Sequence, residues 1–184
     1  MSLAERIALV NEKIAAAARQ AGREPSEVTL VAATKVQTSD TIRQAIAAGV
    51  TICGENRVQE MTAHLDDDAY AGAALHFIGH LQTNKVRQVV GRVELIESVG
   101  SEHLLEAIEA QAAKLELVQD ILLEVNIGGE ASKSGISPEE LSALAAQAVG
   151  SPHVRLRGLM AIPPVAAGPD GNRPVFYKNA SALC

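Results

Sequence analysis

A lysine follows directly on an apolar segment near the start of the chain. In "VTLVAATK", residues 28–35, small and branched apolar residues lead into Thr34 and Lys35. Burying an ammonium group without a partner is costly, so a strand that ends on a lysine places the amine near solvent or a ligand. A partly desolvated lysine amine also forms Schiff bases with aldehydes. Lys35 is therefore either a strand-end lysine that reaches solvent or an aldehyde-binding residue.

Polar residues also occur at the end of one further apolar segment and inside another. Asn56 follows "VTICGE" and His76 lies in "ALHFIG". The amide of Asn56 can hydrogen-bond a ligand hydroxyl or ring substituent without adding charge. His76 is either a hydrogen-bonded core imidazole or a group that faces the site, and its spacing from His80 is unlike a metal site because the segment is strand-like. Three further histidines are expected at the surface: His64, His103 and His153.

Helical and strand-like segments alternate along the chain. Capping signals and apolar periodicity predict helices at 3–21, 41–49, 56–65, 84–90, 102–115, 137–149 and 172–183. Branched and apolar runs predict strands at 26–35, 50–54, 74–79, 93–99, 118–127 and 153–162. The expected caps are Ser2 with Glu5, Ser39 and Asp40, Thr83, Ser101, and Ser137 with Glu140. The first strand is expected to be buried.

This alternation predicts parallel βαβ units, in a (β/α)₈ barrel or an open doubly wound sheet. No G-x-G-x-x-G follows a strand, which weakens the dinucleotide-binding form of the open sheet. Strands that end in polar residues favour a barrel with its site at the strand carboxyl ends. A closed barrel needs eight strands and usually about 250 residues, whereas only six strands are visible here.

Composition excludes several classes of function. A net charge of −6, no Trp, two Phe and two Tyr argue against nucleic-acid binding. No apolar run is long enough to cross a bilayer, and the N-terminal segment contains acids, unlike a signal peptide. Cys53 and Cys184 are expected to be free thiols in a reducing compartment, so we expect a cytoplasmic protein.

Five segments occur together in a characteristic order: "VTLVAATK", "ICGENRVQE", "LHFIGHLQTNKV", "LLEVNIGGEASKSG" and "VRLRGLMAIPP". With them the chain resembles the pyridoxal phosphate homeostasis protein family. The resemblance implies an α/β fold, a (β/α)₈ TIM-type barrel like the N-terminal domain of alanine racemase (fold type III). It implies pyridoxal 5′-phosphate bound to Lys35 as a Schiff base, with Asn56 beside it and His76 and Met160 near the barrel mouth. The resemblance also implies a protein that carries or buffers this cofactor without robust catalysis, with apo-enzymes that use the cofactor as candidate partners.

The alternative is a small fold-type III racemase or decarboxylase that uses Lys35. A racemase needs acid–base groups on both faces of the cofactor, and neither Tyr70 nor Tyr177 is placed as such a base. A third interpretation is a non-binding fragment that acts through protein contacts.

The expected organisation is one incomplete barrel domain, residues 1–184. The resemblance implies seventh and eighth strands, with a phosphate site in their loops, after the helix that begins at "NRPVF", whereas the sequence stops at "NASALC". Open strand edges would then favour self-association.

Overall fold

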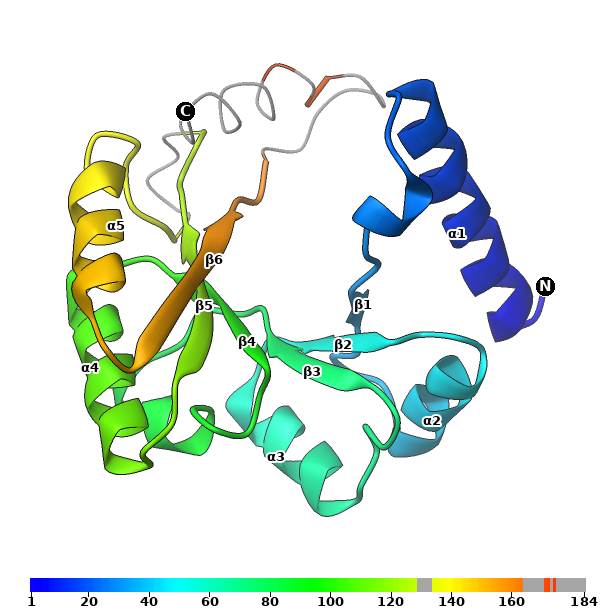
Figure 1. The fold of residues 1–184 in the computed structure, drawn as a ribbon. Coiled ribbons are helices and arrows are strands. Elements are labelled where there is room, and N and C mark those ends of the chain that lie inside the picture. The colour runs from blue at the N-terminus through cyan, green and yellow to red at the C-terminus, as the bar shows by residue number, and fades with distance from the viewer. Residues whose placement is uncertain (129–133, 164–170, 173, 175–184) are drawn as a thin grey trace. The chain divides into compact units, whose positions relative to one another are not determined.

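The computed structural model describes residues 1–128, 134–163, 171, 172 and 174, and it divides into two compact units (Figure 1). The first unit is Met1–His76 and the second is Phe77–Cys184. The predicted helix at 172–183, Tyr177 and Cys184 lie largely or wholly outside the described residues. No helix in the described ranges is long and apolar enough to cross a membrane. The expectation of one domain stays a prediction.

Helices and short strands alternate in the first unit. Its elements are α1 (Leu3–Gln20), the 3₁₀ helix η1 (Pro25–Glu27), β1 (Ala32–Ala33), α2 (Ser39–Ala47), β2 (Ile52–Glu55), α3 (Val58–Asp66) and the start of β3 (Ala74–Phe77). The predicted capping box of α1 is confirmed, because Ser2 and Glu5 exchange hydrogen bonds between side chains and backbone. The predicted cap of α2 is wrong by a residue or two: the hydroxyl of Thr38 accepts the N–H of Thr41.

The first strand is shorter and more exposed than predicted. Only Ala32 and Ala33 are paired as strand, the predicted strand start overlaps η1, and Val28 is exposed. Branched residues favour extended backbone, but whether a strand is buried depends on the elements that pack against it. Among the described residues, β1 is hydrogen-bonded only to β2, so its other edge is unpaired there.

The second unit continues the alternation. Its elements are η2 (Thr83–Gln88), β4 (Leu95–Val99), α4 (Glu102–Lys114), β5 (Gln119–Glu124), α5 (Leu141–Gly150) and β6 (Val154–Met160). The predicted cap of α4 is confirmed, since the Ser101 hydroxyl accepts the N–H of Leu104 at 3.2 Å. Thr83 does not cap an α-helix: it begins the 3₁₀ helix η2, which has no side-chain cap. Ser137 and Glu140 do exchange hydrogen bonds, but α5 begins after them.

The strands follow one another in the sheet in the order β1-β2-β3-β4-β5-β6. The pairs β1–β2, β4–β5 and β5–β6 are parallel. In the first unit the buried apolar side chains include Ile42, Cys53 and Met61, and in the second Ile96, Ile108 and Leu123. Parallel strands in chain order, joined through helices, confirm the predicted α/β class and are the arrangement of a (β/α) barrel.

Candidate functional site

Lys35 stands at the carboxyl end of β1, in a tight turn. Thr34 is buried, Lys35 is exposed, and the turn closes with a hydrogen bond from the Gln37 N–H to the Thr34 carbonyl at 3.1 Å. No hydrogen bond or ion pair links the Lys35 ammonium to another residue that the structure describes. The side chain is therefore exposed and makes no polar contact with the described residues.

The register of β1 and β2 brings Lys35 and Asn56 to the same level. Ala33 is paired with Gly54, and the Thr34 N–H donates to the Gly54 carbonyl at 2.9 Å, so Lys35 and Asn56 follow the paired segment by the same number of residues. The Oδ1 atom of Asn56 is buried and accepts no hydrogen bond from the described residues. A buried polar atom without a partner is costly, and it marks a position where a ligand group can bind.

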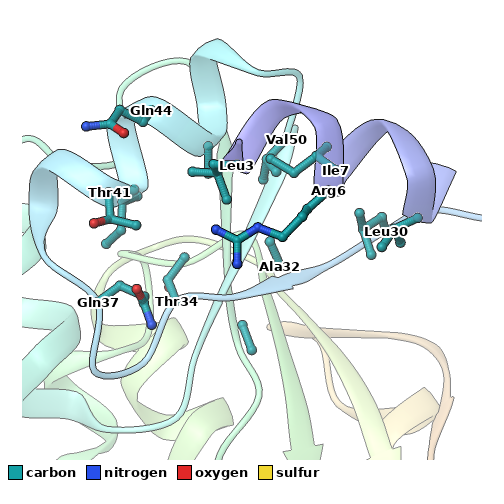
Figure 2. Close-up of a pocket in the computed structure, with 14 residues that line it drawn as sticks. Leu3, Arg6, Ile7, Leu30, Ala32, Thr34, Gln37, Thr41, Gln44 and Val50 are labelled. Atoms are coloured by element: carbon teal, nitrogen blue, oxygen red, sulfur yellow. The ribbon is translucent and has the colours of Figure 1, made fainter. Parts of the chain in front are cut away.

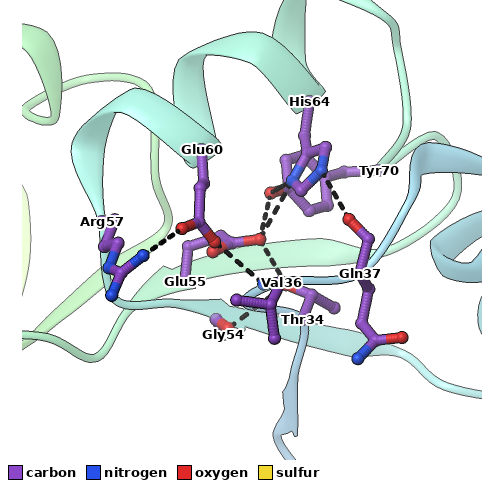
Figure 3. Close-up of polar contacts among 9 residues, drawn as sticks. All are labelled: Thr34, Val36, Gln37, Gly54, Glu55, Arg57, Glu60, His64 and Tyr70. Atoms are coloured by element: carbon purple, nitrogen blue, oxygen red, sulfur yellow. Dashed lines mark hydrogen bonds and ion pairs between the residues drawn. The ribbon is translucent and has the colours of Figure 1, made fainter.

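The carboxylate of Glu55, the last residue of β2, is buried (Figure 3). Its Oε1 accepts the Thr34 hydroxyl at 2.7 Å and the Tyr70 hydroxyl at 2.8 Å. The Nδ1 atom of His64 lies 3.1 Å from both Glu55 Oε1 and the Tyr70 oxygen. Thr34 and Glu55 thus face α3, and Lys35 and Asn56 are the residues that follow them.

The His64 ring is held at both of its nitrogens. The Nε2 atom of His64 lies 3.1 Å from the Gln37 carbonyl, which only accepts, so Nε2 carries a hydrogen. On the other side of the ring, Nδ1 contacts Glu55 and Tyr70, so these contacts together fix the orientation of the ring.

Burial changes the acidity of two neighbouring groups. Burial and then the hydrogen bond to Glu55 raise the pKa of Tyr70 well above its usual value, so the phenol stays a donor. Burial, with the charge of Glu55, raises the pKa of Cys53 to about 11. Cys53 is a free thiol, and it is protonated near neutral pH.

The residue after Lys35 has a strained backbone. Val36 has φ of +56°, a conformation that costs a branched residue roughly 1–3 kcal/mol. Its side chain is 74% exposed, so packing does not hold it there. Instead its N–H donates to Glu60 Oε2 at 2.9 Å. That hydrogen bond is the main cause that lowers the pKa of Glu60, and Arg57 acts in the same direction.

The other two predicted site residues lie on later strands. His76 is buried in β3, as both interpretations of it required, and it does make a polar or charge interaction. Met160 is the last residue of β6, in the second unit, and is half-buried. The surface prediction for His64 is wrong: its side chain is only 12% exposed, because it packs on Glu55 and Tyr70.

Sequence reasoning did not connect Glu55, His64 and Tyr70. A charged residue inside an apolar strand was the available signal, because a buried carboxylate needs donors. The contacting residues His64 and Tyr70 come from α3 and the following loop, and no short spacing rule links them to Glu55.

Two cavities are lined by neither Lys35 nor Asn56. In the first unit, a cavity of about 610 Å³ between α1, α2 and β1 is mostly apolar, and Figure 2 shows Arg6 reaching into it. In the second unit, a polar cavity of about 690 Å³ includes His80, Ser98 and Glu124. Burial raises the pKa of Glu124, and the charge of His80 opposes this shift.

Parallel strands in chain order with helices between them define an α/β protein of the (β/α)-barrel class. The chain belongs to the family described as alanine racemase, N-terminal domain, whose model matches residues 10–182. Within it, the chain is 40% identical over 178 residues to a pyridoxal phosphate homeostasis protein of Aquifex aeolicus, covering 97% of this chain and 78% of that protein. A protein of the same name from Escherichia coli K12 is 39% identical, over 88% of this chain and 70% of its own length.

Solved structures agree with this assignment. An unknown protein from Bifidobacterium adolescentis has a TM-score of 0.91 and 36% identity, covering 98% of this chain and 77% of that one. PipY of Synechococcus elongatus, solved with PLP bound, has a TM-score of 0.82 and 29% identity over 98% of this chain and 80% of its own. Alanine racemase of Corynebacterium glutamicum, at 14% identity, covers 85% of this chain and 45% of its own, and its TM-score of 0.69 shows the shared fold. The predicted alanine racemase-like fold is confirmed.

Proposed function

We propose that this chain binds pyridoxal 5′-phosphate as a Schiff base with Lys35 and carries or buffers the cofactor without robust catalysis. The observation that carries the proposal is an exposed lysine beside a buried amide oxygen, each without a hydrogen-bond partner among the residues that the structure describes. The names of the relatives and the PLP bound to PipY support the choice of cofactor.

The functional groups of Lys35 and Asn56 are of the types that bind pyridoxal phosphate. Bound pyridoxal phosphate supplies an aldehyde for an amine and a ring that withdraws electrons. Lys35 offers that amine, and Asn56 offers a neutral hydrogen-bonding group that orients a polar substituent. We assign His76 and Met160 to the lining of the site on the resemblance alone. Glu55 accepts a hydrogen bond from the Thr34 hydroxyl and Glu60 accepts one from the Val36 N–H.

Binding without turnover is favoured over racemase or decarboxylase activity. Racemisation needs a second acid–base group beside the cofactor. Tyr70 is buried and donates its hydroxyl to Glu55, with a raised pKa, so it is not available for that role. A sensitive racemisation assay that found activity dependent on Lys35 would favour the enzyme instead.

The test is covalent trapping. The purified chain is incubated with pyridoxal phosphate, reduced with borohydride, and analysed by intact mass and peptide mapping. We expect one added pyridoxyl group, on Lys35, absent in Lys35→Ala and retained in Lys13→Ala, which alters an exposed lysine on α1. Labelling spread over surface lysines, or no adduct, would refute the proposal.

Three finer proposals accompany this function. We infer that the loaded chain passes its cofactor to apo-enzymes, which recovery of activity in an apo-enzyme mixed with loaded protein would test. We infer self-association through strand edges, since β1 has one paired edge among the described residues, and sedimentation velocity over a concentration series tests it. We also place the protein in the cytoplasm, where the free thiol of Cys53 would stay reduced; cell fractionation tests this.

A further inference from the structure

The turn that carries Lys35 is held by two side chains of one helix. Glu60 and His64 are four residues apart on α3, so they share one face of the helix. Glu60 Oε2 accepts the Val36 N–H at 2.9 Å, and His64 Nε2 donates to the Gln37 carbonyl, 3.1 Å away. Figure 3 shows both side chains reaching from α3 to the turn.

The two side chains are themselves fixed. Glu60 Oε1 accepts from the Arg57 guanidinium at 2.9 Å, and the His64 ring is fixed on its other side by Glu55 and Tyr70. The backbone they hold would not keep its shape unaided, because Val36 is in the left-handed region with an exposed side chain.

We propose that Glu60 and His64 are positioning residues that hold the turn Thr34–Gln37 in the conformation that presents the Lys35 amine. Neither touches the amine; they act through the backbone on either side of it. The effect on cofactor capture rests on the function proposed above. Without this support the turn samples other conformations, and apparent affinity falls with the fraction of competent molecules.

Conservative variants separate positioning from general stability. Glu60→Ala removes the acceptor of the Val36 N–H, whereas Glu60→Gln keeps a carbonyl oxygen in its place. His64→Gln keeps a donor for the Gln37 carbonyl, and His64→Leu does not. Gln59→Ala, at an exposed neighbouring position on α3, is the matched control.

The first readout uses no cofactor. Amide hydrogen exchange of the peptide containing Val36 should be about tenfold faster in Glu60→Ala, since a charged hydrogen bond is lost, and within about threefold of wild type in Glu60→Gln. Melting temperatures recorded in parallel establish that each variant is folded. Exchange in Glu60→Ala equal to that in Gln59→Ala would overturn the proposal.

The second readout is borohydride-trapped adduct on Lys35 at subsaturating pyridoxal phosphate, with Lys13 in the same sample as reference. We expect about tenfold less Lys35 adduct in Glu60→Ala and His64→Leu, with rescue in Glu60→Gln and His64→Gln. Faster exchange with unchanged capture would refute the positioning role and leave the proposed function standing. No Lys35 adduct in the wild type would refute the proposed function, and the exchange result would still decide whether Glu60 holds the turn.

Discussion

Replacing Tyr70 with Phe tests the buried network beneath the lysine turn. The change removes only the hydroxyl, which donates to Glu55 Oε1 at 2.8 Å. Glu55 is fully buried, and its Oε2 accepts no hydrogen bond within the described ranges, so water does not readily replace the lost donor. A hydrogen bond to a charged group contributes roughly 1.5–3 kcal/mol. We expect the free energy of unfolding to fall by that amount, or the melting temperature by about 3–12 °C.

Urea denaturation followed by circular dichroism measures this loss. Ser26→Ala, which removes an exposed hydroxyl in η1, is the control and should stay within about 0.5 kcal/mol of wild type. A double-mutant cycle with Glu55→Gln isolates the interaction energy between Tyr70 and Glu55. In the neutral amide background, Tyr70→Phe should cost about 0.5–1.5 kcal/mol, the range for uncharged hydrogen bonds. A Tyr70→Phe protein as stable as the control would refute the network's contribution.

The difference in stability between wild type and Tyr70→Phe should also depend on pH. The folded-state pKa of Tyr70 is raised by burial and by Glu55, whereas the unfolded value is about 10. Above pH ~10 the unfolded chain releases the phenolic proton and the folded chain keeps it, so wild-type stability falls as pH rises. The stability difference between wild type and Tyr70→Phe should therefore shrink above that pH, and a constant difference would contradict the assignment.

Three further predictions concern other parts of the chain. Cys53 is buried and its pKa is raised to about 11, so iodoacetamide should modify it at pH 8 only after unfolding, as peptide mapping would detect. Ser101→Ala removes the acceptor of the Leu104 N–H and should cost about 1 kcal/mol in urea denaturation. Burial raises the pKa of Glu124, so its contribution to stability is present at low pH and lost as pH rises through the folded-state value. Glu124→Gln should accordingly be more stable than wild type at pH 8 and similar near pH ~4, and the opposite order would contradict this.

Local signals in the sequence were sufficient for much of the fold. The capping box of Ser2 and Glu5 and the cap Ser101 depend on residues within one helical turn, and both are confirmed. The exposure of β1 was not predictable, because branched residues specify extended backbone while burial depends on neighbouring elements. His64 was misplaced for a similar reason: its partners Glu55 and Tyr70 come from a strand and a loop, and only the fold brings them together.

The two carboxylates near the lysine turn, those of Glu55 and Glu60, accept hydrogen bonds from other groups. Glu55 accepts the hydroxyls of Thr34 and Tyr70, and Glu60 accepts the Val36 N–H. The neutral amide of Asn56 is the polar group level with the lysine. The acids near this turn thus stabilise its backbone and the buried network beside it.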